Sequence, residues 1–290
     1  MLSVKAVPAS HLSEAPMTMV EGAMPSESLT VEQAIANLNQ TDDPSLRYYA
    51  AWWLGRFRVS QPAAIAALVT ALDDEADRSP DGGYPLRRNA ARALGKLQDP
   101  SVGLALIQCL DCPDYYVREA AAQALGDLGD RTCIEALQAK LVGGVEAAVP
   151  VPGKPHLVEP YGAILETLGM LKATTAIAAI RPFLRHSVPA VQNSAARALY
   201  QLTGEEQYAE QLVTVLQSPT LQLRRSALMD LGAVGYLPAA EAIAATLAEN
   251  SLKLIALKGL LDQHLTAPEG QPPVLSDRVI AVMDLMDELL

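Results

Sequence analysis

A ten-residue pattern recurs along this chain and restricts the folds that the chain can adopt. An aliphatic residue is followed by Arg, then by two small apolar residues, and finally by a Leu-Gly pair, as in residues 46–55, 86–95 and 117–126. Weaker copies continue the series, and the anchor leucines are Leu54, Leu94, Leu125, Leu168, Leu199, Leu231 and Leu260. Most anchors lie about 30 residues apart, which is typical of a helical repeat array. One continuous array is therefore predicted, rather than two independent domains.

The composition supports an array of helices. Half of the residues are hydrophobic but only 4% are aromatic, and 47 Ala and 43 Leu residues dominate the chain. Ala and Leu favour helices, whereas a sheet protein would contain more Val, Ile, Thr and aromatic residues. We expect an all-α, HEAT-like helical-repeat solenoid of about seven helix pairs. Residues 28–290 would form this single domain, with a C-terminal helix over 276–290 that caps the array or docks a partner, and residues 1–27 would form a tail or partner-binding arm.

The Arg that recurs in the pattern has a structural and a functional interpretation. It is Arg47, Arg87, Arg118 and Arg224 in the clearest units. In HEAT-like arrays such an arginine usually bonds to acidic or carbonyl groups of adjacent turns. We therefore expect a structural role for these four side chains.

Two insertions interrupt the regular spacing. The extra residues fall near 73–85 and 143–160, in each case between the first and the second helix of a unit. Both loops are then expected at the same edge of the array, and insertions in such arrays tend to gather on the binding face. The first insertion contains Tyr84, and the second contains Lys154 and His156. These three residues are loop candidates for a binding site.

The outward positions of the second helices give a further set of candidates, because residues at i, i+4 and i+8 share one face of a helix. These residues are Tyr48, Trp52 and Arg56 in the first unit and Arg88, Arg92 and Lys96 in the second. Arg pairs with carboxylates and aromatic rings stack on planar groups, so this face suits a flat, anionic, conjugated ligand. The alternative is an ordinary solvated face beside an aromatic cluster.

Charge and hydropathy exclude several classes of function. With 33 acidic and 22 basic residues the formal net charge is −11, which argues against broad nucleic-acid binding. The sequence contains no apolar run of 18 or more residues, and its first 24 residues lack the apolar core of a signal peptide, so no membrane span and no leader are expected.

Motifs of enzymes and of metal sites are nearly absent. The sequence has no glycine-rich phosphate loop and no nucleophile elbow, and none of its four histidines is followed by Glu. Cys109 and Cys112 form a pair without a second pair, and Cys133 would have to lie close to them to complete a zinc site. We expect no metal. The small number of cysteines fits a reducing compartment.

Four segments carry a more specific resemblance. Residues 47–59 (RYYAAWWLGRFRV), 84–95, 109–130 and 154–162 resemble the alpha, or E, subunit of the heterodimeric phycocyanobilin lyases. The likeness extends over most of the chain from about residue 28. The double tryptophan and the positions of the insertions are its specific part, since the repeat itself occurs in many scaffolds.

The resemblance implies a cyanobacterial enzyme of phycobilisome assembly. Together with a homologous F-type subunit, it would attach phycocyanobilin through a thioether to one cysteine of the phycocyanin alpha chain. The bilin is then a substrate, no cofactor is bound permanently, and the expected location is the cytoplasm. The resemblance supplies no catalytic residues, so these remain unknown and the binding candidates above come from the residues alone.

Two alternatives to this function stay open. One is a non-enzymatic HEAT-like scaffold or adaptor in phycobilisome turnover, which would share the repeat. The other is the E subunit of an isomerising bilin lyase, whose product would differ in absorbance.

Overall fold

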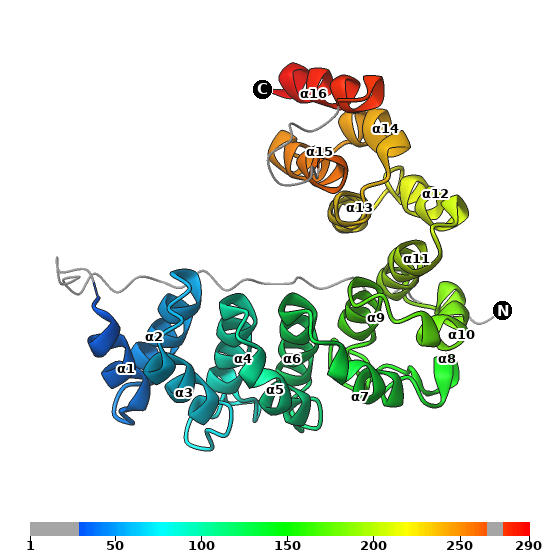
Figure 1. Ribbon diagram of the computed structural model, residues 1–290. Helices are drawn as coiled ribbons and strands as arrows, with labels where there is room; N and C mark the ends of the chain where they lie inside the picture. Colours follow the sequence, from blue (N-terminus) through cyan, green and yellow to red (C-terminus); the bar gives the residue numbers. More distant parts are fainter. Residues whose placement is uncertain (1–28, 266–274) are drawn as a thin grey trace. The chain divides into compact units, whose positions relative to one another are not determined.

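The computed structural model describes residues 29–265 and 275–290. In these residues the chain forms seven pairs of α-helices, one short helix α8 (Gly144–Ala147) between the two members of the fourth pair, and one more helix after the last pair (Figure 1). The same residues contain no strand beyond an isolated antiparallel bridge. The pairs are α1 (Val31–Asn39) and α2 (Pro44–Arg56), α3 (Pro62–Ala71) and α4 (Pro85–Leu97), α5 (Gly103–Cys109) and α6 (Tyr115–Leu128), α7 (Ile134–Ala139) and α9 (Tyr161–Met170), α10 (Ile177–Ile180) and α11 (Pro189–Thr203), α12 (Glu206–Val215) and α13 (Leu221–Val234), and α14 (Ala240–Ala245) and α15 (Asn250–His264). The predicted all-α array of about seven pairs is confirmed.

The start of the second helices follows from the local sequence. In α2 the Asp43 carboxylate accepts hydrogen bonds from the backbone N–H groups of Ser45 and Leu46, and Pro44 occupies the first turn. Asp114 caps α6 in the same manner by accepting from the N–H of Tyr116. Such caps satisfy backbone donors that have no partner within the helix, and proline at the first turn removes one such donor.

Successive second helices approach each other closely through the Gly of the repeat. A Cβ on Gly55 would lie 2.7 Å from the Cα of Ala93, and a Cβ on Gly95 would lie 2.7 Å from the Cα of Ala124. No side chain fits these contacts, which explains why small residues recur there. In α11 the glycine is replaced by Tyr200, whose ring instead packs against Tyr236 with 5.7 Å between the ring centres.

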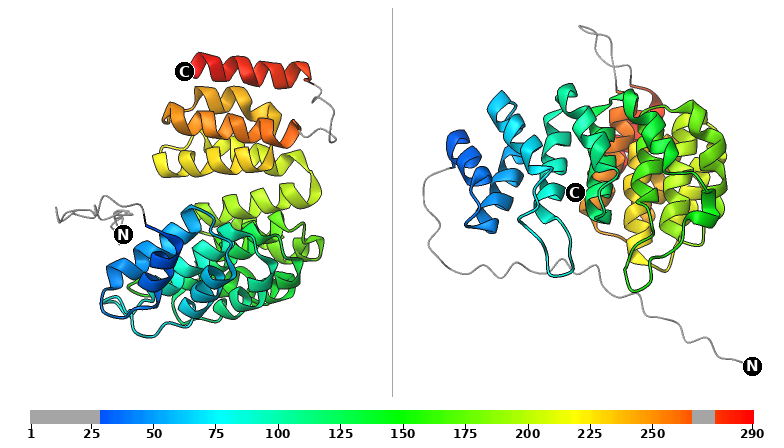
Figure 2. Two further views of the ribbon diagram at one scale, coloured as in Figure 1. Left: turned by 60° about the vertical axis from the view of Figure 1, so that its left-hand side comes forward. Right: turned by 90° about the horizontal axis from the view of Figure 1, so that it is seen from below.

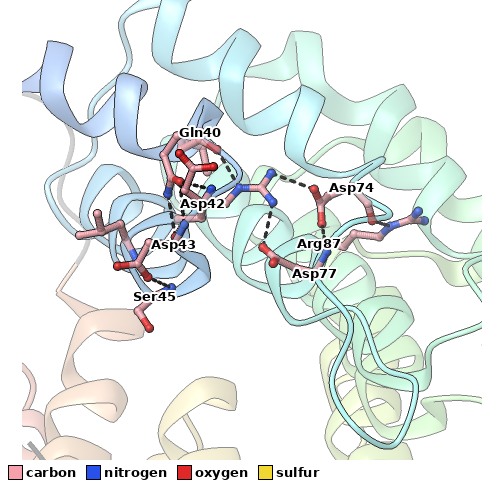
Figure 3. Close-up of polar contacts among 10 residues, drawn as sticks. Gln40, Asp42, Asp43, Ser45, Asp74, Asp77 and Arg87 are labelled. Carbon is pink, nitrogen blue, oxygen red and sulfur yellow. Dashed lines mark hydrogen bonds and ion pairs between the residues drawn. The ribbon is translucent and has the colours of Figure 1, made fainter. Parts of the chain in front are cut away.

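The repeated arginine of the first unit holds the first insertion. The Arg47 guanidinium lies 2.8 Å from an Asp74 carboxylate oxygen and 2.9 Å from an Asp77 oxygen, and its Nε donates to the Leu38 carbonyl. Figure 3 shows Asp74, Asp77 and Arg87 together at this point, where Arg87 Nε donates to the backbone carbonyl of Asp74. The insertion therefore begins from a fixed base.

The repeated arginine of the third unit holds the second insertion in the same way. Arg118 donates to the Glu159 carboxylate at 2.9 Å and to the Val158 carbonyl at 2.7 Å. Arg224, in a unit without an insertion, donates within the described residues only to the backbone carbonyls of Ser218 and Leu247. The structural role predicted for the four arginines is confirmed.

The second insertion contains one short helix and a hairpin-like turn. Helix α8 (Gly144–Ala147) is followed by a turn in which the Val151 N–H donates to the His156 carbonyl and the Val158 N–H donates to the Val149 carbonyl. The side chain of His186 is buried, and its Nδ1 atom accepts a hydrogen bond from the Val188 N–H. Because Nδ1 accepts, Nε2 carries the proton of the ring and donates it to the Ala148 carbonyl. This insertion is thus fastened at both ends.

The last helix, α16 (Asp277–Leu289), packs against α14 and α15 (Figure 2). Its buried side chains are Val279 and Val282. Leu290, beyond the last turn, is 92% exposed, and the role of this helix in docking a partner stays a prediction. None of the helices in residues 29–265 and 275–290 is long and apolar enough to span a membrane. The arm predicted over residues 1–27 lies outside the described residues and stays a prediction.

Candidate functional site

A pocket of about 630 Å³ opens where the two insertions meet the start of α6. Its walls come from residues 78 and 81–84 of the first insertion, 113–118 at the start of α6, and 151–158 of the second insertion. We call it the insertion pocket. Its volume falls within the range of about 300–1,000 Å³ that is usual for small-molecule sites. The expectation that both insertions lie at one edge therefore agrees with their shared wall.

One wall of the insertion pocket is a corner of three aromatic rings. The His156 imidazole stacks on Tyr115 with 4.2 Å between ring centres and 10° between planes. The Tyr116 ring stands almost perpendicular to both, at 81° to His156 and 90° to Tyr115. Burial and the nearby Glu119 carboxylate raise the pKa of Tyr115, so its hydroxyl stays protonated. The corner is a rigid apolar surface with polar edges.

Tyr84 belongs to the part of the wall that the first insertion contributes. It is only 8% exposed, and the guanidinium carbons of Arg78 and Arg87 lie 3.8 Å and 4.1 Å from its ring centre. Arg78 also donates to the Tyr84 hydroxyl at 2.8 Å. The Tyr84 backbone N–H donates to the Asp114 carboxylate, which caps α6 with its other oxygen. The cation–π contacts therefore hold Tyr84 within the first insertion and against α4, and the shared Asp114 carboxylate ties the insertion to α6.

The three loop candidates lie together in this pocket. Tyr84 is a buried part of its wall, His156 belongs to the aromatic corner, and the Lys154 side chain is exposed at its edge. Their chemical roles remain predictions.

Arg88 and Arg92 on α4 form a second polar surface next to the pocket. Neither side chain makes a hydrogen bond or ion pair within the described part of the chain, and Nε of Arg88 is buried without a partner. Burial and the neighbouring charge of Arg88 lower the pKa of Arg92. The Arg88 guanidinium lies 5.9 Å from the ring centre of Tyr116, so this surface and the insertion pocket are contiguous. The Glu119 carboxylate interacts electrostatically with both arginines but makes no hydrogen bond or ion pair with either in the described residues. Two neighbouring cations that no carboxylate contacts directly favour an anionic ligand.

The other four candidates differ in their surroundings. Tyr48 is half-buried, and burial together with Asp77 and Asp74 raises its pKa. Trp52 is 48% exposed and stacks on Tyr49 with 5.6 Å between ring centres. Arg56 and Lys96 are exposed at the ends of their helices. Trp52 and Tyr48 therefore offer aromatic surface, while Arg56 and Lys96 offer only solvated charge.

Comparison with known proteins places this architecture in a family. HEAT repeats match residues 31–103, 78–143 and 159–251. The phycocyanobilin lyase subunit alpha of Synechococcus elongatus is 61% identical over 274 residues, which cover 94% of this chain and 100% of that protein. The corresponding subunit of Nostoc sp. is 62% identical over 262 residues, covering 90% of this chain and 94% of the relative.

This chain belongs to the phycocyanobilin lyase alpha subunit family. A solved structure agrees with that assignment over the full length. The complex of CpcE and CpcF of phycocyanin lyase from Nostoc sp. PCC7120 contains a chain that is 56% identical to this one, with a TM-score of 0.84 and complete coverage of both chains. The resemblance inferred from the sequence is confirmed.

Sequence reasoning did not identify the pocket residues Tyr115, Tyr116 and Arg78 of this family member. The signal was present, because the two tyrosines follow Pro113 and Asp114 at the start of a second helix, on the edge where the insertions were expected. Their packing on His156 depends on the conformation of the second insertion, which no periodicity predicts.

The cysteines of this family member are buried thiols. Burial raises the pKa of Cys109 to about 12 and that of Cys133 to about 11, so neither is a thiolate near neutral pH. Across the described residues, no group of three or more His, Cys, Asp and Glu side chains is placed to hold a metal ion. The thiols of Cys109 and Cys133 are thus poorly suited to act as nucleophiles.

Proposed function

We propose that this chain is one of two subunits of a lyase that attaches phycocyanobilin to phycocyanin through a thioether bond. The observation that carries the proposal is the identity of about three residues in five to phycocyanobilin lyase alpha subunits over nearly the whole chain. The full-length likeness to a chain of the CpcE–CpcF complex supports a homologous second subunit as partner. The acceptor of the bilin would be a cysteine of the phycocyanin alpha chain.

The chain's own part in this reaction is to position the reactants. The attacking thiol would belong to the acceptor protein, in agreement with the buried, protonated thiols of Cys109 and Cys133 in this chain. The sulfur bonds to the ethylidene carbon of the bilin and the proton of the thiol is returned to the neighbouring carbon, so no oxidant is required. Holding the two reactants in a suitable orientation can by itself supply a large rate enhancement.

We propose Arg88 and Arg92 as the groups that bind the two propionates of the bilin, with Tyr48 and Trp52 against its rings. Support comes from the absence of any ion pair or hydrogen bond at the two arginine side chains within residues 29–265 and 275–290. Arg56 and Lys96, which are exposed, would add long-range attraction rather than direct contacts.

We also propose that phycocyanobilin is a passing substrate rather than a resident cofactor, and that the enzyme works in the cytoplasm. Three free cysteines fit a reducing compartment. The arm over residues 1–27 is proposed as a partner contact.

Reconstitution tests the function directly. The chain, a candidate F-type subunit, phycocyanobilin and apo-phycocyanin alpha chain are mixed, and a covalent fluorescent product is sought on a denaturing gel. We expect the product only when all four components are present. A binding scaffold without lyase activity would give no covalent product above the level without enzyme. An isomerising lyase would give a product with the absorbance of a different bilin.

A further inference from the structure

The insertion pocket is adjacent to the arginine surface but has chemistry of its own. We propose that it binds a terminal lactam ring of the bilin, stacked on the corner formed by Tyr115, Tyr116 and His156. This inference rests on the proposed function, since it names the part of the substrate that the insertions hold. A lactam ring is planar and presents one N–H donor beside one C=O acceptor, and the pocket offers a complement to each.

The shape of the corner fits a flat ring. Tyr115 and His156 are already parallel, and Tyr116 stands across their edges. A planar ring laid against this corner can extend the stack with one face while an edge meets the Tyr116 ring. Offset stacking and edge-to-face contacts are the preferred arrangements of aromatic groups, and each contributes beyond the area that it buries.

His156 supplies the acceptor for the lactam N–H. Its Nδ1 lies 2.8 Å from the backbone carbonyl of Leu157. A carbonyl oxygen can only accept, so Nδ1 carries the proton of this hydrogen bond. In the neutral imidazole Nε2 is then a lone-pair acceptor, and the hydrogen bond of Nδ1 fixes the orientation of the ring. Nε2 makes no hydrogen bond within the described part of the chain.

Lys154 and Arg78 supply donors for the lactam carbonyl. The exposed ammonium group of Lys154 forms no ion pair or hydrogen bond in the parts of the chain that the structure describes. Among the residues that the structure describes, Arg78 donates only to the neutral oxygens of Tyr84 and Gly82. Two carboxylates belong to this pocket. Asp114 is already engaged by two backbone N–H groups. Asp81 accepts from the Ser79 hydroxyl and attracts Lys154 without forming an ion pair with it in the described residues.

The position of the pocket suits an elongated tetrapyrrole. Arg88 reaches the Tyr116 ring from α4, at 5.9 Å from the ring centre, so the corner borders the surface proposed for the propionates. The propionates are on the inner rings of a bilin and the lactams are on its end rings. One ligand can therefore occupy the arginine surface with its middle and the insertion pocket with one end.

The test measures binding without turnover, using the full-length chain in complex with its second subunit. The probe is biliverdin, which has the lactam ends and propionates of the substrate but a vinyl group in place of the reactive ethylidene. Titration is followed by absorbance for the wild type and for His156→Ala, His156→Phe and Lys154→Ala. We expect His156→Ala to weaken binding at least tenfold, and the other two variants to weaken it several-fold, because Phe keeps the stack without the acceptor.

Two controls separate the possible outcomes. Lys258→Ala removes an exposed lysine far along the chain and should leave the affinity unchanged. Protoporphyrin IX has propionates and pyrroles but no lactam, so its weaker binding should not respond to His156→Phe.

Equal biliverdin affinity for the wild type, His156→Ala and Lys154→Ala, each within twofold, would overturn the pocket assignment. That result leaves the lyase function intact if the wild-type complex still forms the covalent product. A wild-type complex that binds biliverdin through His156 but forms no product would instead overturn the proposed function alone. Lys154 is exposed, so its variant remains informative if a His156 variant fails to fold.

Discussion

Arg92 and Arg197 occupy the same place in two repeats, two residues before an anchor leucine, but they have opposite surroundings. The Arg92 side chain makes no hydrogen bond or ion pair in the described part of the chain. Arg197 Nη1 lies 3.2 Å from both a Glu166 oxygen on α9 and an Asp230 oxygen on α13. The first arginine remains available to a ligand, whereas the charge of the second is neutralised within the protein.

The packing of the two regions differs in the same way. Around α4 the helices meet through Gly95 and Ala124. Between α11 and α13 the glycine is replaced by Tyr200, and the place of the small residue is taken by Asp230, which is 4% exposed. A buried carboxylate requires a partner, and Arg197 provides it. The comparison teaches that one repeat position can be left without an ion pair in one half of the array, where we propose that it binds a ligand, and can hold helices together in the other half.

The largest expected effect comes from removing the second arginine. Arg197→Ala leaves Glu166 and Asp230 partly or fully buried without a cation, so we expect the free energy of unfolding to fall by about 3–5 kcal/mol. Arg92→Ala should change it by less than about 0.5 kcal/mol. Urea unfolding followed by circular dichroism measures both. Similar losses for the two variants would contradict the contrast between the regions.

The pH dependence of stability should also separate the regions. Burial, and then the charge of Glu166, raises the pKa of Asp230 to about 6 from an ordinary value of 3.8. Between these pH values the native state binds more protons than the unfolded state, so this group's contribution to stability falls as pH rises from about 4 to about 6. The difference in unfolding free energy between the wild type and Asp230→Asn should change by up to about 3 kcal/mol over that range. A difference that is independent of pH would show that Asp230 does not titrate there.

Removing the arginines of α4 should impair binding without unfolding. We expect the double variant Arg88→Ala, Arg92→Ala to weaken bilin binding about 100-fold, because two charge-assisted hydrogen bonds are lost. Titration with phycocyanobilin in the presence of the second subunit measures the loss. Arg131→Ala, an exposed arginine elsewhere on the chain, serves as the control. Unchanged affinity and attachment rate in the double variant would sink the proposed propionate site.

The smallest effect concerns the close contact between helices. Gly95→Ala places a Cβ 2.7 Å from the Cα of Ala124, and the resulting strain should cost about 1–3 kcal/mol of stability. Gly162→Ala is the control, since its Cβ would meet only the Ser194 hydroxyl at 3.4 Å. Thermal unfolding should show a lower melting temperature for Gly95→Ala alone. Equal melting temperatures would mean that α4 and α6 shift apart at no cost.

The repeat made the fold predictable, because the Leu-Gly anchors report directly on helix packing. The edge at which the insertions lie was also predictable from the spacing. The aromatic corner was not, since the stacking of His156 on Tyr115 depends on a turn that hydrogen bonds of residues 149–158 create. The ion pairs of Arg197 with Glu166 and Asp230 were not predicted for a different reason. Asn193 has the same place relative to its anchor leucine as Arg88, but it is 2% exposed, so an outward position in the repeat does not guarantee contact with solvent.

The fastening of the insertions by Arg47 and Arg118 has a consequence for how this protein can change. A unit without an insertion keeps the same arginine, as Arg224 shows by bonding to backbone carbonyls. The arginine that can bind the base of an inserted loop is therefore present even in a unit that has no inserted loop. We expect such a unit to accept a loop of a different length and sequence without change to its helices, provided that the loop supplies an acidic or carbonyl oxygen at its base.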